Sequence, residues 1–251
     1  MTPYYDEGGI TIYHNDCREI LPTLKPVDVV IADPPYSEHV HTKNRRGVGA
    51  NSGALAVARD LGFESLSLGD LDEAALEISR LSRRWALVFS DVELCHLWRE
   101  ALTASAELWY VRTGIWLKNN TAPQFTGDRP AVGFETITMC HPEGRMRWNG
   151  GGRPGVWKFD DEIGDLIFHH RIVRSSSESG RVHTAEKPLA LMRELIREFS
   201  EPGALILDPF MGSGTTLRAA ERPGSTRHRH RAQAELLRDR QAPACPGRAE
   251  L

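Results

Sequence analysis

The stretch VDVVIADPPY, residues 27–36, is the most informative segment of this chain. Five of its first six residues are apolar and most of these are β-branched, which is typical of a buried β-strand. The strand then meets an acid, two prolines and a tyrosine, Asp33 to Tyr36. Proline restricts φ and has no backbone N–H, so this tetrapeptide is stiff and cannot continue a sheet. The sequence therefore predicts a buried strand that ends in a rigid polar loop at the edge of a sheet.

The length and composition are those of an ordinary soluble protein. The chain has 251 residues and a mass of 28.1 kDa, with 40% hydrophobic and 26% charged residues, which is enough for one sizeable core. No apolar run approaches the roughly 20 residues that span a bilayer, and the start MTPYYDEGG lacks the features of a signal peptide. We therefore expect a single cytoplasmic domain that does not associate with membranes.

Charge and cysteine usage narrow the classes of partner. The net charge of −3 argues against a general polyanion binder, yet basic residues cluster at 39–47, 145–153 and 169–176. These clusters favour a localised nucleic-acid face. The four cysteines lie far apart without zinc-ligand spacing, so we expect no disulfide framework and no metal site.

Strands and helices alternate along most of the chain. Strands are expected at 8–15, 27–32, 85–90, 108–117, 133–140 and 204–207, and helices at 16–24, 71–84, 91–102, 189–199 and after residue 214. Asp70, with Glu73 three residues later, is expected to cap the second helix. Helices between strands imply an α/β fold with a mostly parallel sheet and helices on both faces. Segments 37–69 and 141–183 match no element and are expected to be functional loops.

A second strand end repeats the pattern of the first. The strand 204–207 opens into Asp208 and the turn FMGSGTT, residues 210–216. Glycines at 212 and 214 allow a close approach of backbone to a ligand, and the helix that follows offers unpaired N–H groups. In an open α/β sheet, ligands bind outside the carboxyl ends of strands, so both Asp-Pro strand ends are predicted to share one site.

Together the two motifs resemble the signatures of the S-adenosylmethionine-dependent amino methyltransferases of DNA, D/N/S-P-P-Y/F and F-x-G-x-G-T. Here residues 33–36 precede the glycine loop at 210–215, which is the motif order of the β group of that family. The resemblance covers about residues 9–220. It implies a Rossmann-like methyltransferase fold with a catalytic domain over residues 1–220, S-adenosyl-L-methionine as the cofactor, and a role in DNA methylation within restriction-modification. Double-stranded DNA is the implied partner, and a homodimer stays open.

The first motif offers a physical route to methylation of a base amine. The lone pair of an exocyclic amine is delocalised into the ring, so the nitrogen is a poor nucleophile. If Asp33 and the carbonyl of Pro35 each accept one N–H, the nitrogen is drawn toward tetrahedral geometry and its lone pair is directed at the methyl group; Pro34 and Pro35 hold the carbonyl in place. Tyr36 provides a stacking face for a flipped-out base. Aspartate at the first motif position favours adenine N6 over cytosine N4.

The resemblance also assigns residues around these motifs. Cofactor contacts are expected from Asp16, His183, Thr184, Lys187, Asp208, Pro209, Phe210, Gly212, Gly214 and Thr215. At the first of these, Asn15-Asp16 replaces the Gly-Asp that is usual in the family. DNA contacts are expected from Lys43, Arg45, Arg46, Arg145, Arg147, Trp148 and Arg153. The first three lie in a DNA-facing loop at about 37–69, and the others in a target-recognition insert at about 141–182 that contains the mobile glycines 150–152.

Residues 221–251 depart from the family pattern. Family members continue with a strand that ends in an acid for the cofactor ribose, followed by a last helix, whereas this tail is rich in arginine and proline. Suitable codons for this segment, read with a one-base offset, can encode the missing strand as AIGIE, so we interpret the tail as out of frame. We accordingly expect a disordered tail from about Pro223, an unpaired edge on the strand 204–207, and weak or absent cofactor binding.

Two other functions stay open. Methyltransferases that act on RNA bases or on glutamine side chains tend to carry Asn-Pro-Pro-Tyr and to have the cofactor loop first, so the motif order disfavours them. The altered tail leaves a second alternative, an inactive remnant that binds DNA or the cofactor without turnover.

Overall fold

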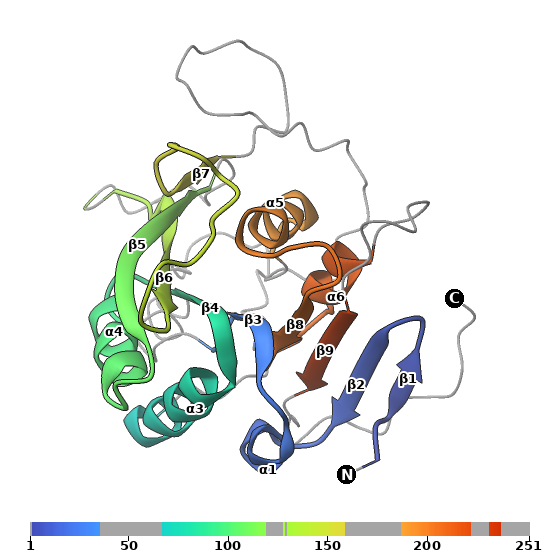
Figure 1. The fold of residues 1–251 in the computed structure, drawn as a ribbon. Coiled ribbons are helices and arrows are strands. Elements are labelled where there is room, and N and C mark those ends of the chain that lie inside the picture. Colours follow the sequence, from blue (N-terminus) through green and yellow to red (C-terminus); the bar gives the residue numbers. More distant parts are fainter. Residues whose placement is uncertain are drawn as a thin grey trace, which may run out of the picture.

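A computed structural model describes residues 2–35, 67–118, 128, 130–158, 187–221 and 231–236, the last range as backbone alone. Its strands are β1 (Tyr5–Glu7), β2 (Ile10–His14), β3 (Val27–Ala32), β4 (Ser82–Ser90), β5 (Trp109–Leu117), β6 (Phe134–His141), β7 (Val156–Lys158), β8 (Leu205–Asp208) and β9 (Arg231–Leu236). Its helices are α1 (Cys17–Ile20), α3 (Leu68–Leu81), α4 (Cys95–Thr103), α5 (Leu189–Phe199) and α6 (Thr215–Ala220), with a 3-10 turn at Leu21–Thr23. Figure 1 shows the strands as one central sheet.

The sheet has the strand order β1-β2-β9-β8-β3-β4-β6-β5-β7. Five of the eight pairings between described strands are parallel, so the expected mostly parallel sheet is confirmed. β6 runs antiparallel to both of its neighbours, β4 and β5. Consequently the first residues of β6 lie at the sheet edge where β3, β4 and β8 end.

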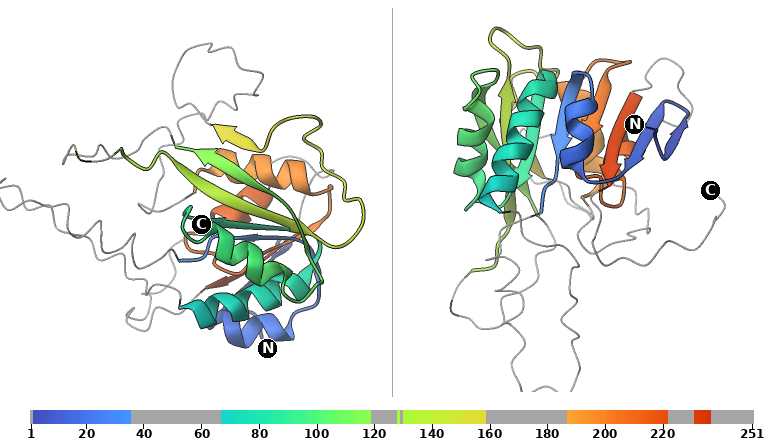
Figure 2. Two further views of the ribbon diagram at one scale, coloured as in Figure 1. Left: turned by 90° about the vertical axis from the view of Figure 1, so that its left-hand side faces the viewer. Right: turned by 90° about the horizontal axis from the view of Figure 1, so that it is seen from below.

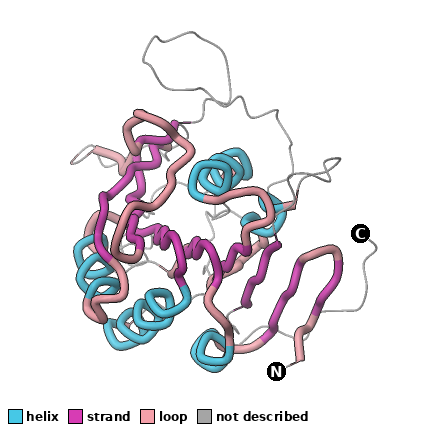
Figure 3. The backbone as a smooth tube through the Cα atoms, in the orientation of Figure 1, coloured by secondary structure: helices cyan, strands magenta, loops and turns pink. Residues whose placement is uncertain are grey.

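Helices cover both faces of this sheet, as Figures 2 and 3 show from different directions. One face packs against α5 and α6 in a core that contains Val29 and Ile31, while the other packs against α1, α3 and α4 in a core that contains Val30 and Ala32. Because β3 is buried on both faces, nearly all of its residues are apolar. The apolar run of residues 27–32 is therefore explained by the central position of its strand.

The start of α3 corrects one prediction. The N–H of Asp70 donates to Ser67 Oγ at 3.2 Å, and the Asp70 carboxylate accepts the N–H of Ser67 at 3.3 Å. This is a capping box in which Ser67 is the N-cap and Asp70 the third helical residue, so the assignment of Asp70 as the cap was wrong. The helix begins at Leu68, earlier than the predicted start at residue 71, because the reciprocal Ser67–Asp70 hydrogen bonds cap it there.

Two short strands were also missed. β1 pairs antiparallel with β2, and β7 pairs with the end of β5 within a segment that was expected to contain no element. Each has only three residues. Strands of that length show no measurable alternation in the sequence, and pairing with a neighbour creates them.

The tail contains a strand, contrary to expectation. β9 lies between β2 and β8 and runs parallel to both, with Ala232 opposite Ile206 of β8 and Ile10 of β2. The expected unpaired edge on β8 is therefore wrong. The stretch RAQAEL alternates polar residues with alanine or leucine, the period-2 pattern of a strand, and this local signal was outweighed by the arginine- and proline-rich composition of the tail around it. The out-of-frame origin of the tail stays a prediction.

Within the described ranges no helix is long and apolar enough to cross a membrane.

We predict that a chain ending at residue 221 is much less stable than the full chain. Without β9, both β2 and β8 present unpaired N–H and C=O groups, which lowers stability and favours aggregation. We expect the melting temperature to fall by roughly 10 °C, which corresponds to a few kcal/mol for a chain of this size. The matched control ends at residue 236 and keeps β9, so it should melt close to the full chain. Equal melting temperatures for the two truncated chains would show that β9 does not stabilise the sheet.

Candidate active site

The two Asp-Pro strand ends lie next to each other. β3 and β8 are neighbours, with Val30 opposite Leu207, so Asp33 just after β3 and Asp208 at the end of β8 reach the same sheet edge. Glycine-rich backbone follows one of these strands and two prolines follow the other. The structure therefore brings together the two motifs that the sequence placed about 170 residues apart, at the carboxyl ends of parallel strands where α/β folds bind ligands.

A buried lysine links the first motif to a residue that the sequence analysis did not single out. Lys187 Nζ lies 2.6 Å from Asp33 Oδ2 and 3.3 Å from Glu135 Oε2. Its side chain is only 8% exposed and its ammonium sits 5.2 Å from the centroid of the Phe89 ring. Lys187 was expected to contact the cofactor, and the structure places its ammonium against two carboxylates.

Burial and charge act in opposite directions on Lys187. Burial by itself lowers the pKa of this ammonium, but the carboxylates of Asp33 and Glu135 more than compensate, and the pKa lies above its ordinary value. The lysine is therefore a cation throughout the neutral pH range. Lys118 also pairs with Glu135, through the other carboxylate oxygen, so two cations and two anions meet at this edge.

Asp208 is a buried carboxyl group at the end of β8. Burial raises its pKa to about 7, and the nearby charge of Asp33 adds to this shift. The Thr216 hydroxyl, the N–H of Phe210 at 2.9 Å from Oδ1, and Lys187 oppose the shift without cancelling it. A positively charged ligand at this edge would favour the ionised form of Asp208.

The turn after β8 requires its glycines for conformation. Gly212 has φ of 52° and Gly214 φ of 80°, the left-handed region that other residues rarely adopt. A Cβ atom at Gly214 would meet nothing within 4 Å, so this position is open on the side where a side chain would point. Gly214 is the N-cap of α6, and Thr215, the first helical residue, is buried. Pro209 and the buried Phe210 connect this turn to the strand.

Asp16 lies at the same edge, after β2. Its carboxylate caps α1 by accepting the N–H of Arg18 at 3.0 Å, and it also pairs with the Arg18 guanidinium at 2.6 Å. Arg18 extends the cluster to Asp70 of α3 at 2.9 Å. Asp16 is therefore held at the end of β2, where its assignment to the cofactor stays a proposal.

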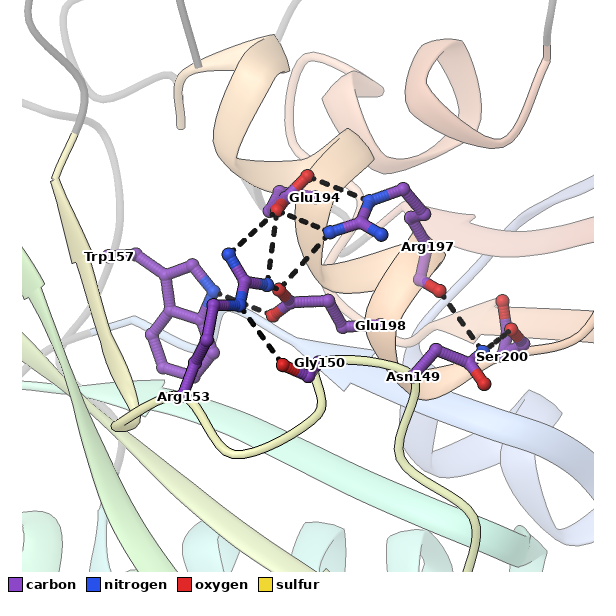
Figure 4. Close-up of polar contacts among 8 residues, drawn as sticks. All are labelled: Asn149, Gly150, Arg153, Trp157, Glu194, Arg197, Glu198 and Ser200. Carbon is purple, nitrogen blue, oxygen red and sulfur yellow. Dashed lines mark hydrogen bonds and ion pairs between the residues drawn. The ribbon is translucent and has the colours of Figure 1, made fainter. Parts of the chain in front are cut away.

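The expected DNA-contacting residues separate into two groups. Arg153 pairs with Glu194 at 3.3 Å and with Glu198, both on α5, and its Nε donates to the carbonyl of Gly150 (Figure 4). Trp157 Nε1 donates to the other oxygen of Glu198 at 3.0 Å. These contacts tie the segment before β7 to α5, so Arg153 has a structural partner that DNA would have to displace.

Trp148 also has an internal position. Its ring packs against Phe199 in the core beneath α5, at 6.3 Å between centroids, and it passes so close to Gly150 that a Cβ there would lie 2.3 Å from the ring. Gly150 is thus needed for space and is buried, which corrects the expectation that it makes a mobile loop. Arg145 and Arg147 are exposed, and the Arg147 side chain, 71% exposed, pairs at the surface with Glu201.

Several assigned residues cannot be placed. Those outside the described ranges are Tyr36, Lys43, Arg45, Arg46, His183 and Thr184. In the part of the chain that is described, no group of three or more His, Cys, Asp or Glu side chains is placed to hold a metal ion.

Sequence reasoning missed Glu135 and Lys118 for a physical reason. It looked for polar residues after the carboxyl ends of strands, whereas Glu135 is near the start of β6 and reaches this edge only because β6 is antiparallel. The available signal was an acid, Glu135, in the predicted strand 133–140, which has no other charged residue.

Comparison with known proteins identifies the family of this chain. The family model for DNA methylase, N6_N4_Mtase, matches residues 27–226. The chain is 25% identical over 215 residues to the type II methyltransferase M.HinfI of Haemophilus influenzae, covering 82% of this chain and 60% of that protein. It is 25% identical over 240 residues to the type II methyltransferase M2.DpnII of Streptococcus pneumoniae, covering 88% and 84%. The fold is similar to that of an M1.HpyAVI–SAM complex, with a TM-score of 0.59, 22% identity, and coverage of 91% and 93%.

The family match spans well over half of the chain, and the chain therefore belongs to the DNA methylases that modify amino groups at adenine N6 or cytosine N4. Its fold is the Rossmann-like methyltransferase fold that the resemblance implied.

We predict that Asp208 makes stability depend on pH. Its pKa of about 7 exceeds the ordinary value of 3.8, so the folded chain holds an extra proton between about pH 4 and 7. The free energy of unfolding from this group therefore falls as pH rises through that range, by on the order of 4 kcal/mol in total, and is constant above it. Asp208→Asn should gain stability relative to the natural chain over the same interval, measured by urea unfolding at pH 5 and pH 8. Parallel pH dependences of the two proteins would contradict the assignment.

Proposed function

We propose that this chain transfers the methyl group of S-adenosyl-L-methionine to the exocyclic amine of a base flipped out of double-stranded DNA. The observation that carries the proposal is the placement of Asp33, whose carboxylate is fixed by a buried lysine at the sheet edge that also carries the glycine turn. The similarity to type II methyltransferases supports the same class of substrate.

The residues after β8 suit the cofactor. S-adenosyl-L-methionine carries a sulfonium and an ammonium, and it supplies the electrophilic methyl group when bound. The buried carboxyl of Asp208 complements these positive charges, and the open position at Gly214 leaves room for a ligand beside the backbone. We assign Asp208, Phe210, Gly212, Gly214 and Thr215 to its binding, together with Asp16. The structurally similar M1.HpyAVI forms a complex with the same cofactor.

The tail adds one candidate. Ala234 of β9 is opposite Asp208, which places Glu235 one residue further along, at the same edge of the sheet. Glu235 is thus a candidate for the acid that contacts the cofactor ribose, the role expected to be lost from this tail. With β9 in place, cofactor binding becomes the expected result, and titration of the protein with the cofactor tests it directly.

The catalytic step needs an acceptor for the substrate amine. We assign this role to the Asp33 carboxylate and the Pro35 carbonyl, with Pro34 and Pro35 limiting backbone freedom. Hydrogen bonds from the amine to both acceptors leave its lone pair directed at the methyl group. We further assign Tyr36 to stacking on the base, and the motif favours adenine N6 over cytosine N4. Digestion of methylated DNA and analysis of its nucleosides distinguishes these two products.

The exposed arginines are the better candidates for DNA contacts. Arg145 and Arg147 extend from the segment before β7 into solvent, whereas Arg153 and Trp148 are engaged inside the protein. We therefore assign phosphate contacts to Arg145 and Arg147, and a supporting role to the other two. Lys43, Arg45 and Arg46 stay proposed contacts from the loop after Tyr36.

We predict that Asp33→Ala lowers the rate of methyl transfer by about 100-fold or more, the contribution typical of a positioned acid or base. Cofactor affinity should change by only a few-fold, because Asp33 is assigned to the substrate amine. A tritiated methyl-transfer assay on duplex DNA and a separate cofactor titration measure the two effects. Asp72→Ala, on the exposed face of α3, is the matched control. Near-normal turnover of the Asp33 variant would show that Asp33 has no role in methyl transfer.

We predict that neutralising Arg145 and Arg147 weakens the salt dependence of DNA binding. A lost phosphate contact reduces the slope of log affinity against log salt concentration by about one unit, so the double Gln variant should lose about two. Arg153→Gln should keep the slope and instead lower the melting temperature, because it disrupts the ion pairs with α5. An unchanged slope in the double variant would show that Arg145 and Arg147 do not contact the DNA phosphates.

A further inference from the structure

Glu135 occupies an unusual position for a buried acid. It is 5% exposed, near the start of β6, and each of its carboxylate oxygens contacts a different lysine. Oε1 pairs with Lys118, which follows β5, and Oε2 lies 3.3 Å from Lys187, which precedes α5. The side chain thus joins two segments that are distant in sequence at the sheet edge where β3 ends.

Lys187 also pairs with Asp33, which follows β3. Its ammonium is 2.6 Å from Asp33 Oδ2, so Asp33 and Glu135 share it; Lys187 and Glu135 are buried, whereas the Asp33 side chain is partly exposed. The contacts therefore form a chain, Lys118–Glu135–Lys187–Asp33, in which positive and negative groups alternate. Asp208, on the neighbouring strand end, is close enough for its pKa to respond to the charges of Asp33 and Lys187.

We propose that Glu135 and Lys187 are a positioning pair for methyl transfer: Glu135 fixes the Lys187 ammonium, and this ammonium holds Asp33 ionised and oriented to accept the N–H of the substrate amine. This inference rests on the proposed function and deepens it. It assigns Lys187 to the acceptor side of the site, although the resemblance assigned this lysine to the cofactor.

The physical reason is the difference between the two forms of a carboxyl group. An ionised carboxylate only accepts hydrogen bonds, whereas a protonated one also donates, and a donor cannot align an amine by its N–H groups. An ammonium at 2.6 Å strongly favours the ionised form. An ionised carboxylate has about four acceptor positions, so the contact with Lys187 leaves capacity for a substrate.

Glu135 is needed because a buried ammonium shared with only one carboxylate would be less restrained. Losing a buried partner leaves the remaining charge undercompensated and free to change rotamer. A displacement of about 1 Å in a positioning group can reduce turnover 100-fold. The pair therefore contributes to turnover without touching the substrate or the cofactor.

Two substitutions test whether the pair affects kcat rather than cofactor binding. Glu135→Gln and Lys187→Met should each lower kcat by about 10-fold to 100-fold at saturating cofactor, with cofactor affinity within about threefold of the natural chain. Lys187→Arg, which keeps the charge, should restore part of the loss. If Lys187→Met instead weakens cofactor binding strongly and keeps kcat at saturating cofactor, the lysine is a cofactor contact and the proposal is overturned.

The pH dependence of kcat separates positioning from a general loss of stability. Lys187→Met should move the acid limb to higher pH, because a carboxylate that loses an adjacent cation takes up its proton more easily. Glu135→Gln should move the alkaline limb to lower pH, because Lys187 then loses its own proton more easily. Unchanged limbs in both variants would contradict the proposal. Glu194→Gln, which removes a buried carboxylate of α5 that pairs with arginines, is the matched control and should keep both kcat and the profile.

A measurement without substrate distinguishes this proposal from the proposed function. With lysines labelled by ¹³C at Cε, the Lys187 signal should titrate above the other lysines and shift to lower pH in Glu135→Gln. If this shift occurs and the natural chain still methylates no DNA, the ion-pair chain is real and the proposed function is wrong. If the natural chain methylates DNA and the Lys187 signal is unaffected by Glu135→Gln, the positioning pair is wrong.

Discussion

The burial of the Lys187 ammonium is the constraint on which the charge arrangement at the sheet edge around Asp33 depends. A cation that is 8% exposed needs compensating charge, and the structure supplies it from Asp33 after β3 and Glu135 on β6. These carboxylates come from strands on either side of β4, so the lysine couples separate parts of the sheet to the segment before α5. The position of Asp33 is thus a consequence of charge balance as well as of the stiff backbone that follows it.

A second network, of ion pairs and hydrogen bonds, holds α5 against the segment before β7. Glu194 and Glu198 face the segment before β7 and hold Arg153, while Asn149 donates to the carbonyl of Ser200 at 2.9 Å (Figure 4). Since Lys187 precedes the same helix, α5 is tied to the sheet edge at its start and to this segment along its length. The helix therefore connects the sheet edge that carries Asp33 and Asp208 with the surface that carries Arg145 and Arg147.

The tail shows that a short strand can form within a segment whose overall composition is unfavourable for one. In residues 231–236, RAQAEL, polar residues alternate with alanine or leucine, and this short stretch completes the sheet between β2 and β8. Two unpaired edges facing each other form a stronger template than a single edge, because an inserted strand is paired on both sides. A segment whose composition suggested disorder thus contributes a central strand, and it brings Glu235 to the edge where the other acids lie.

Local sequence was sufficient to predict the fold class, the two motifs and their neighbouring strand ends, since buried parallel strands require apolar runs and stiff or glycine-rich loops mark where they stop. It also identified Asp33 and Asp208. Two sets of charged contacts became visible only in three dimensions. Glu135 reaches the edge that carries Asp33 because β6 is antiparallel, and Arg153 pairs with Glu198 on α5. Such contacts join residues far apart in the chain, and their pairing depends on strand direction and helix placement, which local sequence does not encode.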